Sequence, residues 1–156
     1  MRNAKGKQRM FKNIVMVCIG NICRSPMAEA ILRHRAQSKN ISINISSAGI
    51  AALVGKPADS NVQELLLEEG IDCSAHKARQ LTSAILLEAE LVLVMEQNHR
   101  KEIECMFPNV CGKVHLLGKW GDFEVPDPYR KSREVFKDTH QLIMQGIDQW
   151  QARLWN

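Results

Sequence analysis

The feature that most constrains the fold is an unbroken run of apolar side chains near the start of the sequence. Residues 14–17 read Ile-Val-Met-Val, with no polar residue between them. A strand with one solvated face alternates apolar and polar residues, whereas a strand buried on both faces of a parallel sheet carries a continuous apolar run. Residues 12–18 are therefore predicted to form a strand covered on both sides.

The rest of the chain alternates between helical and strand patterns. Helices are predicted over residues 26–37, 59–69, 82–88, 97–106 and 132–154, the first with Ser25 as N-cap and Pro26 as its first residue. Further strands are predicted at Ile41, Ile43 and Ile45 up to Gly49, at residues 90–95 and at residues 113–117. This order predicts an α/β, doubly wound (Rossmann-like) fold with a four-stranded parallel sheet flanked by helices.

The length of 156 residues and the apolar fraction of 45% suit a single domain with a real core. We expect residues 11–156 to form this domain and the basic, polar residues 1–10 to be a flexible extension. No segment is long and apolar enough to predict membrane insertion, and residues 1–10 do not resemble a secretory signal. A cytoplasmic location is the expectation that follows.

Cysteine spacing and net charge limit the possible cofactors and partners. The five cysteines include no Cys-x-x-Cys pair, which predicts reduced thiols and no metal site. The net charge of +4 is spread along the chain, so nucleic acid is not indicated as a partner. An anionic substrate and an ordinary solvated basic surface explain this charge equally well.

The turn after the first strand carries Cys18 and Arg24, separated by five residues. Ligands of doubly wound folds bind at the carboxyl ends of the strands. A loop of this length, running from a strand into a helix N-terminus, can aim backbone N–H groups at a phosphate while Arg24 grips two of its oxygens. The same positive field favours the thiolate of Cys18, the form that attacks phosphorus. The alternative is that Cys18 simply ends a buried strand and Arg24 lies on the surface.

Residues 18–26, Cys-Ile-Gly-Asn-Ile-Cys-Arg-Ser-Pro, resemble the signature of the low-molecular-weight protein-tyrosine phosphatases. Residues 127–129, Asp-Pro-Tyr, match the acid loop of that family, and the resemblance continues through residues 46–49, residues 76–80 and the C-terminal helix. It implies a phosphatase without metal or cofactor, in which Cys18 is the nucleophile, Arg24 clamps the phosphate and Asp127 is the general acid.

The resemblance implies roles for the neighbouring residues as well. Ser25 would hydrogen-bond the thiolate, although a plain helix cap is compatible with its position, and Asn21, Ser47 and His76 would brace the loop. The residues expected to contact the substrate are Ile19, Gly20, Asn21, Ile22, Cys23, Leu53 and Tyr129. Cys23 either forms a reversible disulfide with Cys18 or is a buried small residue.

Residues 127–132 and 51–55 are similar to a bacterial branch associated with capsule and exopolysaccharide export. In that branch the partner is a phosphotyrosine protein, a membrane-anchored tyrosine autokinase. One alternative is a thioredoxin-coupled arsenate reductase, which needs a cysteine relay, but Cys73, Cys105 and Cys111 do not match that pattern. A non-catalytic phosphotyrosine-binding module is expected to lack the nucleophile or the acid. The sequence does not predict the oligomeric state.

Overall fold

The computed structural model describes residues 11–155, so the extension predicted at residues 1–10 lies outside the described part. Four strands form one sheet in the order β2-β1-β3-β4, and every neighbouring pair is parallel. The strands are β1 Asn13–Cys18, β2 Asn44–Gly49, β3 Leu91–Val94 and β4 Val114–Leu116. The predicted fold class is confirmed.

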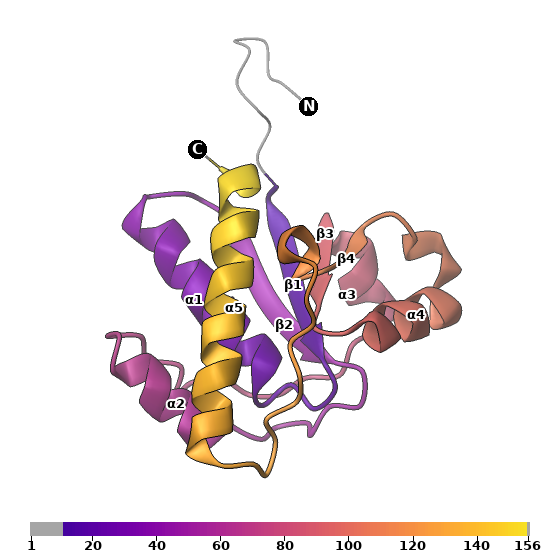
Figure 1. Cartoon of the computed structure of the whole chain (residues 1–156). Helices are drawn as coiled ribbons and strands as arrows, with labels where there is room; N and C mark the ends of the chain where they lie inside the picture. The colour runs from indigo at the N-terminus through magenta and orange to yellow at the C-terminus, as the bar shows by residue number, and fades with distance from the viewer. Residues whose placement is uncertain (1–10, 156) are drawn as a thin grey trace.

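Helices cover both faces of this sheet (Figure 1). They are α1 Arg24–Ser38, α2 Ser60–Leu67, α3 Ser83–Glu88, α4 Gln97–Met106 and α5 Arg133–Leu154, with short 3-10 turns at η1 Pro108–Val110 and η2 Lys119–Gly121. One apolar cluster contains side chains of α1, α2 and α5, and a second contains side chains of α3 and α4. The sheet therefore separates two hydrophobic cores.

Strand β1 supplies side chains to both cores, which explains its continuous apolar sequence. Ile14 and Met16 belong to the cluster under α1 and α5, whereas Val15 and Val17 belong to the cluster under α3 and α4. Successive side chains of a strand point to opposite faces, so neither face of β1 tolerates a polar residue.

Strand β2 begins later than its alternating isoleucines predicted. Asn44 pairs with Asn13, the first residue of β1, so there is no partner strand beside Ile41 and Ile43. These two isoleucines are instead partly buried against the core at the end of α1. Strand β1 is shorter than predicted by one residue at its start, β3 and β4 are shorter by one residue at each end, and α4 has the predicted bounds.

The prediction of Ser25 as N-cap and Pro26 as the first residue of α1 is wrong. The helix begins at Arg24, its N-cap is Cys23, and Cys23 makes no capping hydrogen bond through its side chain. Ser25 lies inside the first turn of α1, where its hydroxyl hydrogen-bonds Cys18 Sγ and does not cap the helix.

Candidate active site

The turn after β1, the segment after β2 and the loop before α5 meet at one pocket of about 160 Å³. Apart from Ser25, the residues that the sequence predicted to bind or transform substrate all line this pocket, together with Ala51. They are Cys18, Ile19, Gly20, Asn21, Ile22, Cys23, Arg24, Leu53, Asp127 and Tyr129. Ser25, Ser47 and His76 do not line it and lie behind the loop.

The backbone of residues 18–23 is held with its carbonyl groups facing the surrounding protein. The carbonyl oxygens of Cys18, Ile19, Gly20 and Ile22 accept from backbone N–H groups of residues 50, 51, 53 and 59 at 2.8–3.0 Å. The carbonyl of Asn21 accepts from His76 Nε2 at 2.7 Å. Each of these carbonyls is therefore fixed on the outer side of the loop.

The N–H groups of the same loop consequently face inward. In a trans peptide the N–H points opposite to the carbonyl of the preceding residue, and none of the peptide bonds is cis. Within residues 11–155, no acceptor binds the N–H groups of residues 19–23. A ring of unsatisfied donors at a helix N-terminus is an anion-binding site.

Arg24 has the largest fully buried side chain among the described residues, and its guanidinium completes this cradle. Its Nη1 donates to Glu96 Oε2 at 2.6 Å and to the carbonyl of Val125 at 2.9 Å. Its Nε is buried and has no partner among the described residues. An unsatisfied buried donor costs about 1–3 kcal/mol, and an oxyanion in the pocket would remove that cost.

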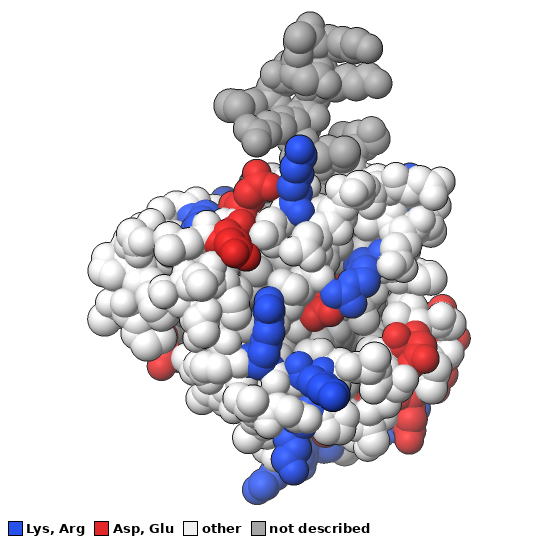
Figure 2. Space-filling view, turned by 180° about the vertical axis from the view of Figure 1, so that it is seen from behind, with Lys and Arg blue, Asp and Glu red and all other residues white. Residues whose placement is uncertain are grey.

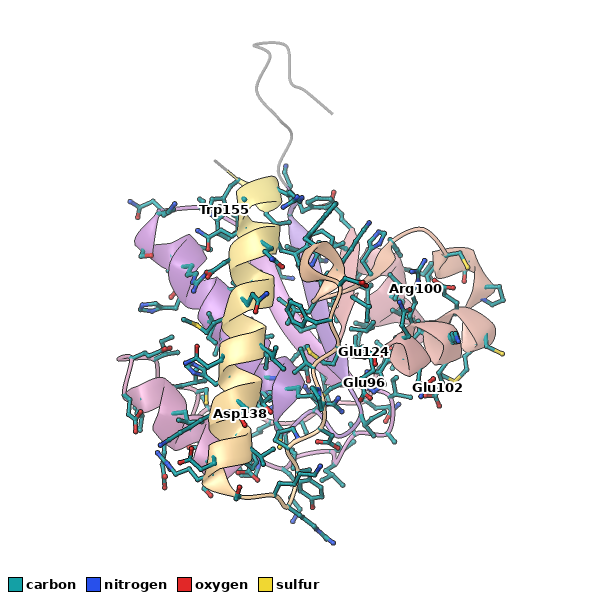
Figure 3. All side chains as sticks on the ribbon, in the orientation of Figure 1. Glu96, Arg100, Glu102, Glu124, Asp138 and Trp155 are labelled. Carbon is teal, nitrogen blue, oxygen red and sulfur yellow. The ribbon has the colours of Figure 1, made fainter. Side chains whose placement is uncertain are left out.

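Glu96, which the sequence analysis did not single out, supplies the counter-charge of Arg24. It lies two residues after the end of β3, as the N-cap of α4, and near Glu124 (Figure 3). His99 Nδ1 accepts from the N–H of Glu96, so its Nε2 carries the proton, 3.3 Å from Glu96 Oε2. Burial, together with the charge of Arg24, lowers the pKa of His99, which keeps this ring neutral at pH 7.

A hydrogen-bond chain behind the loop determines which way the hydroxyl of Ser25 points. The Nδ2 group of Asn21 donates to Ser25 Oγ at 2.8 Å and to Ser47 Oγ at 2.9 Å, and the Ser47 hydroxyl donates to Glu29. Ser25 Oγ thus accepts from Asn21 and has its own proton left for Cys18 Sγ, at 2.9 Å.

Two local conformations let the loop take this shape. Asn21 is fully buried with φ at 60°, a left-handed conformation that asparagine tolerates better than most residues. A Cβ on Gly49, at the end of β2, would lie 2.4 Å from the carbonyl oxygen of Ile19. Only glycine lets strand and loop approach so closely.

Asp127 lies on an irregular segment beside the cradle, with its side chain half exposed. The segment is anchored by the N–H of Val125, which donates to the carbonyl of Met95 at 2.9 Å. Asp127 Oδ1 accepts from the N–H of Tyr129, and its Oδ2 lies 3.8 Å from Arg24 Nη2. A carboxyl group is thereby held at the mouth of the pocket, close to the position an anion would occupy.

The remaining groups set the polarity of the pocket. Leu53 and Tyr129, each about 40% exposed, are its apolar walls. Burial and the nearby carboxylate of Asp59 raise the pKa of Cys23, which is therefore a neutral thiol. Within residues 11–155 no three His, Cys, Asp or Glu side chains are grouped as metal ligands would be, and no helix is long and apolar enough to cross a membrane.

Comparison with known proteins identifies relatives over nearly the whole chain. Residues 13–156 match the family model described as low molecular weight phosphotyrosine protein phosphatase. The probable low molecular weight protein-tyrosine-phosphatase EpsP of Ralstonia solanacearum is 43% identical over 93% of this chain and 97% of its own. The low molecular weight protein-tyrosine-phosphatase Wzb of Escherichia coli K12 is 41% identical, with the same coverage of each chain.

A solved structure agrees with these sequence relatives. Vibrio vulnificus Wzb in complex with benzylphosphonate superimposes with a TM-score of 0.86 at 40% identity, covering 92% of this chain and 99% of that one. Benzylphosphonate is thus bound by a protein of this fold.

Proposed function

The chain belongs to the low molecular weight phosphotyrosine protein phosphatase family, and we propose that it hydrolyses phosphotyrosine in two steps through a phosphorylated Cys18. The thiolate of Cys18 attacks phosphorus, and the bond from phosphorus to the tyrosine oxygen breaks as Asp127 protonates that oxygen. Water, deprotonated by Asp127, then attacks the cysteinyl phosphate, which releases inorganic phosphate and restores the thiolate.

The inward-facing N–H groups of residues 19–23, beside the unpartnered Nε of Arg24, are the observation that carries this proposal. They are fixed donors for the phosphate oxygens on which negative charge accumulates in the transition state. Because the surrounding protein holds the loop carbonyls, the donors need not reorganise when the substrate binds.

Ser25 is proposed to act on the sulfur in both steps. Its hydroxyl, directed at Cys18 by Asn21, stabilises the thiolate before attack and again when sulfur leaves the phosphoenzyme. The side chains of Asn21, Ser47 and His76 are positioning groups in this proposal, because they brace the loop and do not contact the substrate.

Variant kinetics test the roles of the nucleophile and the acid. Cys18→Ser is expected to abolish hydrolysis of p-nitrophenyl phosphate and phosphotyrosine, whereas Cys105→Ser, an exposed thiol on α4, retains it. Asp127→Ala is expected to slow the hydrolysis of phenyl phosphate more than that of p-nitrophenyl phosphate, because a phenolate leaving group needs a proton more than a nitrophenolate does. Turnover by Cys18→Ser, or an equal loss on both aryl phosphates, would refute the respective role.

The arsenate reductase alternative is not favoured. Such a reaction needs a second and a third thiol in relay from the nucleophile, and Cys23 is the one other cysteine among the described residues that lines the pocket. Cys105 and Cys111 are exposed elsewhere, on and after α4.

We further propose that the substrate is the phosphotyrosine-rich tail of a membrane-anchored tyrosine autokinase, which would place the enzyme in the cytoplasm. The similarity of residues 127–132 and 51–55 to the exopolysaccharide branch supports this proposal, as does the relation to proteins named EpsP and Wzb. Dephosphorylation of such an autokinase tail should proceed with a higher kcat/KM than that of an unrelated phosphotyrosine protein. Equal values for the two would argue against the autokinase.

A further inference from the structure

The rim of the pocket carries two adjacent cations on a tight turn. The N–H of Tyr129 donates to Asp127 Oδ1 at 3.0 Å, and the N–H of Lys131 donates to the carbonyl of Pro128 at 2.9 Å. Between them Arg130 has a φ of 62°, a left-handed conformation that non-glycine residues rarely adopt. This turn connects the proposed general acid directly to the start of α5.

The backbone of this turn brings the side chain of Arg130 against Tyr129. The guanidinium carbon lies 5.2 Å from the centre of the tyrosine ring, within the range of a cation–π contact. Tyr129 lines the pocket and Arg130 does not. The positive charge is therefore held beside the wall of the pocket and outside the cradle that receives the phosphate.

Neither cation of the turn has an acidic partner within residues 11–155. No carboxylate lies within ion-pair distance of Arg130 or Lys131, although Arg133, close by in sequence, pairs with both Glu64 and Glu68. Figure 2 shows Lys and Arg side chains gathered over the lower end of its face, the end where the loop before α5 lies in Figure 1. The cations of the rim are thus available to a ligand.

We propose that Arg130 and Lys131 form a docking surface for acidic residues that flank the phosphotyrosine of the substrate. This inference rests on the proposed function, because the phosphotyrosine in the pocket fixes the peptide beside the rim. Arg130 contributes most, since its contact with Tyr129 holds the charge in place and lowers the entropy lost on binding. An exposed pair of this kind changes kcat/KM about 2- to 5-fold per cation and is screened by salt.

Paired phosphotyrosine peptides test this docking surface. Each acidic peptide carries Asp or Glu on both sides of the phosphotyrosine, and its partner carries Asn or Gln at the same positions. The readout is the ratio of their kcat/KM values, so a general change in activity cancels. The variants are Arg130→Asn, which tolerates the left-handed backbone, Arg130→Glu, Lys131→Gln and the matched control Lys39→Gln at the far end of α1.

The parent and Lys39→Gln are expected to prefer the acidic peptide at low salt and to lose much of this preference in about 1 M salt. Arg130→Asn should lower the ratio more than Lys131→Gln, and Arg130→Glu should invert it, so that the neutral peptide is preferred. A flat ratio in the parent, or a preference that survives Arg130→Glu, would overturn the docking surface. Loss of hydrolysis of every peptide by the parent would instead refute the proposed function.

Discussion

At the level of single side chains, the buried guanidinium of Arg24 depends on residues far away in sequence. Its carboxylate partner, Glu96, is brought to it by the adjacency of β1 and β3. The sequence indicated Cys18, Arg24 and Asp127 because their motifs are local. It did not indicate Glu96, although a polar residue directly after a buried parallel strand was a usable signal.

Glu96 does not line the pocket, so replacing it should weaken phosphate binding indirectly, through Arg24. Glu96→Gln removes the charge that orients the Nη1 edge of Arg24, and we expect a fall of roughly 10-fold or more in kcat/KM for p-nitrophenyl phosphate. Glu102→Gln, an exposed position on α4, is the matched control. Unchanged kinetics in Glu96→Gln would show that the carbonyl of Val125 suffices to hold Arg24.

Oxidation should distinguish the two cysteines of the loop. Mild peroxide is expected to convert Cys18 to a sulfenic acid, which the thiol of Cys23 then attacks to give a disulfide and water. Because the pKa of Cys23 is raised, its thiolate fraction and the rate of disulfide closure should increase as the pH rises from 7 to 9.

Peptide mapping and recovery of activity in dithiothreitol measure this outcome. The parent should recover fully, and Cys23→Ser should progress to irreversibly oxidised Cys18. Sulfinic acid at Cys18 in the parent at mild doses, with Cys23 still free, would contradict it.

For the individual helices and strands, local sequence signals predicted that an element exists better than they predicted the residues at which it begins and ends. The helices predicted to start at Asp59, Thr82 and Ser132 begin one residue later, and these three residues are their N-caps. The start of α1 was misplaced because the hydroxyl of Ser25 bonds the thiol of Cys18 and does not cap. The start of β2 was misplaced because a strand needs a partner, and β1 begins only at Asn13.

The contact between α5 and the end of β4 depends on a glycine. A Cβ on Gly146 would lie 2.9 Å from both the carbonyl oxygen and the Cγ of Leu117. Gly146→Ala gains about 1 kcal/mol of helix propensity, but overpacking costs about 1–3 kcal/mol, so we expect a net loss of stability. Gln145→Ala, exposed on the same helix, should change the free energy of unfolding by less than about 0.5 kcal/mol. Urea unfolding measures both, and a stabilised Gly146→Ala would contradict this packing.

Across the protein as a whole, the sequence predicted a parallel sheet but not the order of its strands. The apolar run of β1 predicted a strand buried on both faces, whereas the order β2-β1-β3-β4 results from crossovers between distant segments. That order determines which segments come together: the turn after β1, the segment after β2 and the Asp127 segment before α5 line the pocket, and Glu96 after β3 binds Arg24. The pocket is thus lined by three separate parts of the chain and supported by a fourth.

The central claim is that phosphate passes through Cys18, and trapping the intermediate tests it most directly. The parent enzyme is quenched in acid during turnover of a phosphotyrosine peptide, and the phosphorylated site is mapped by mass spectrometry. We expect one phosphoryl group on the peptide that contains Cys18, and none when Cys18→Ser is treated in the same way. Phosphate on another residue, or steady turnover with no phosphoenzyme at any quench time, would contradict the account.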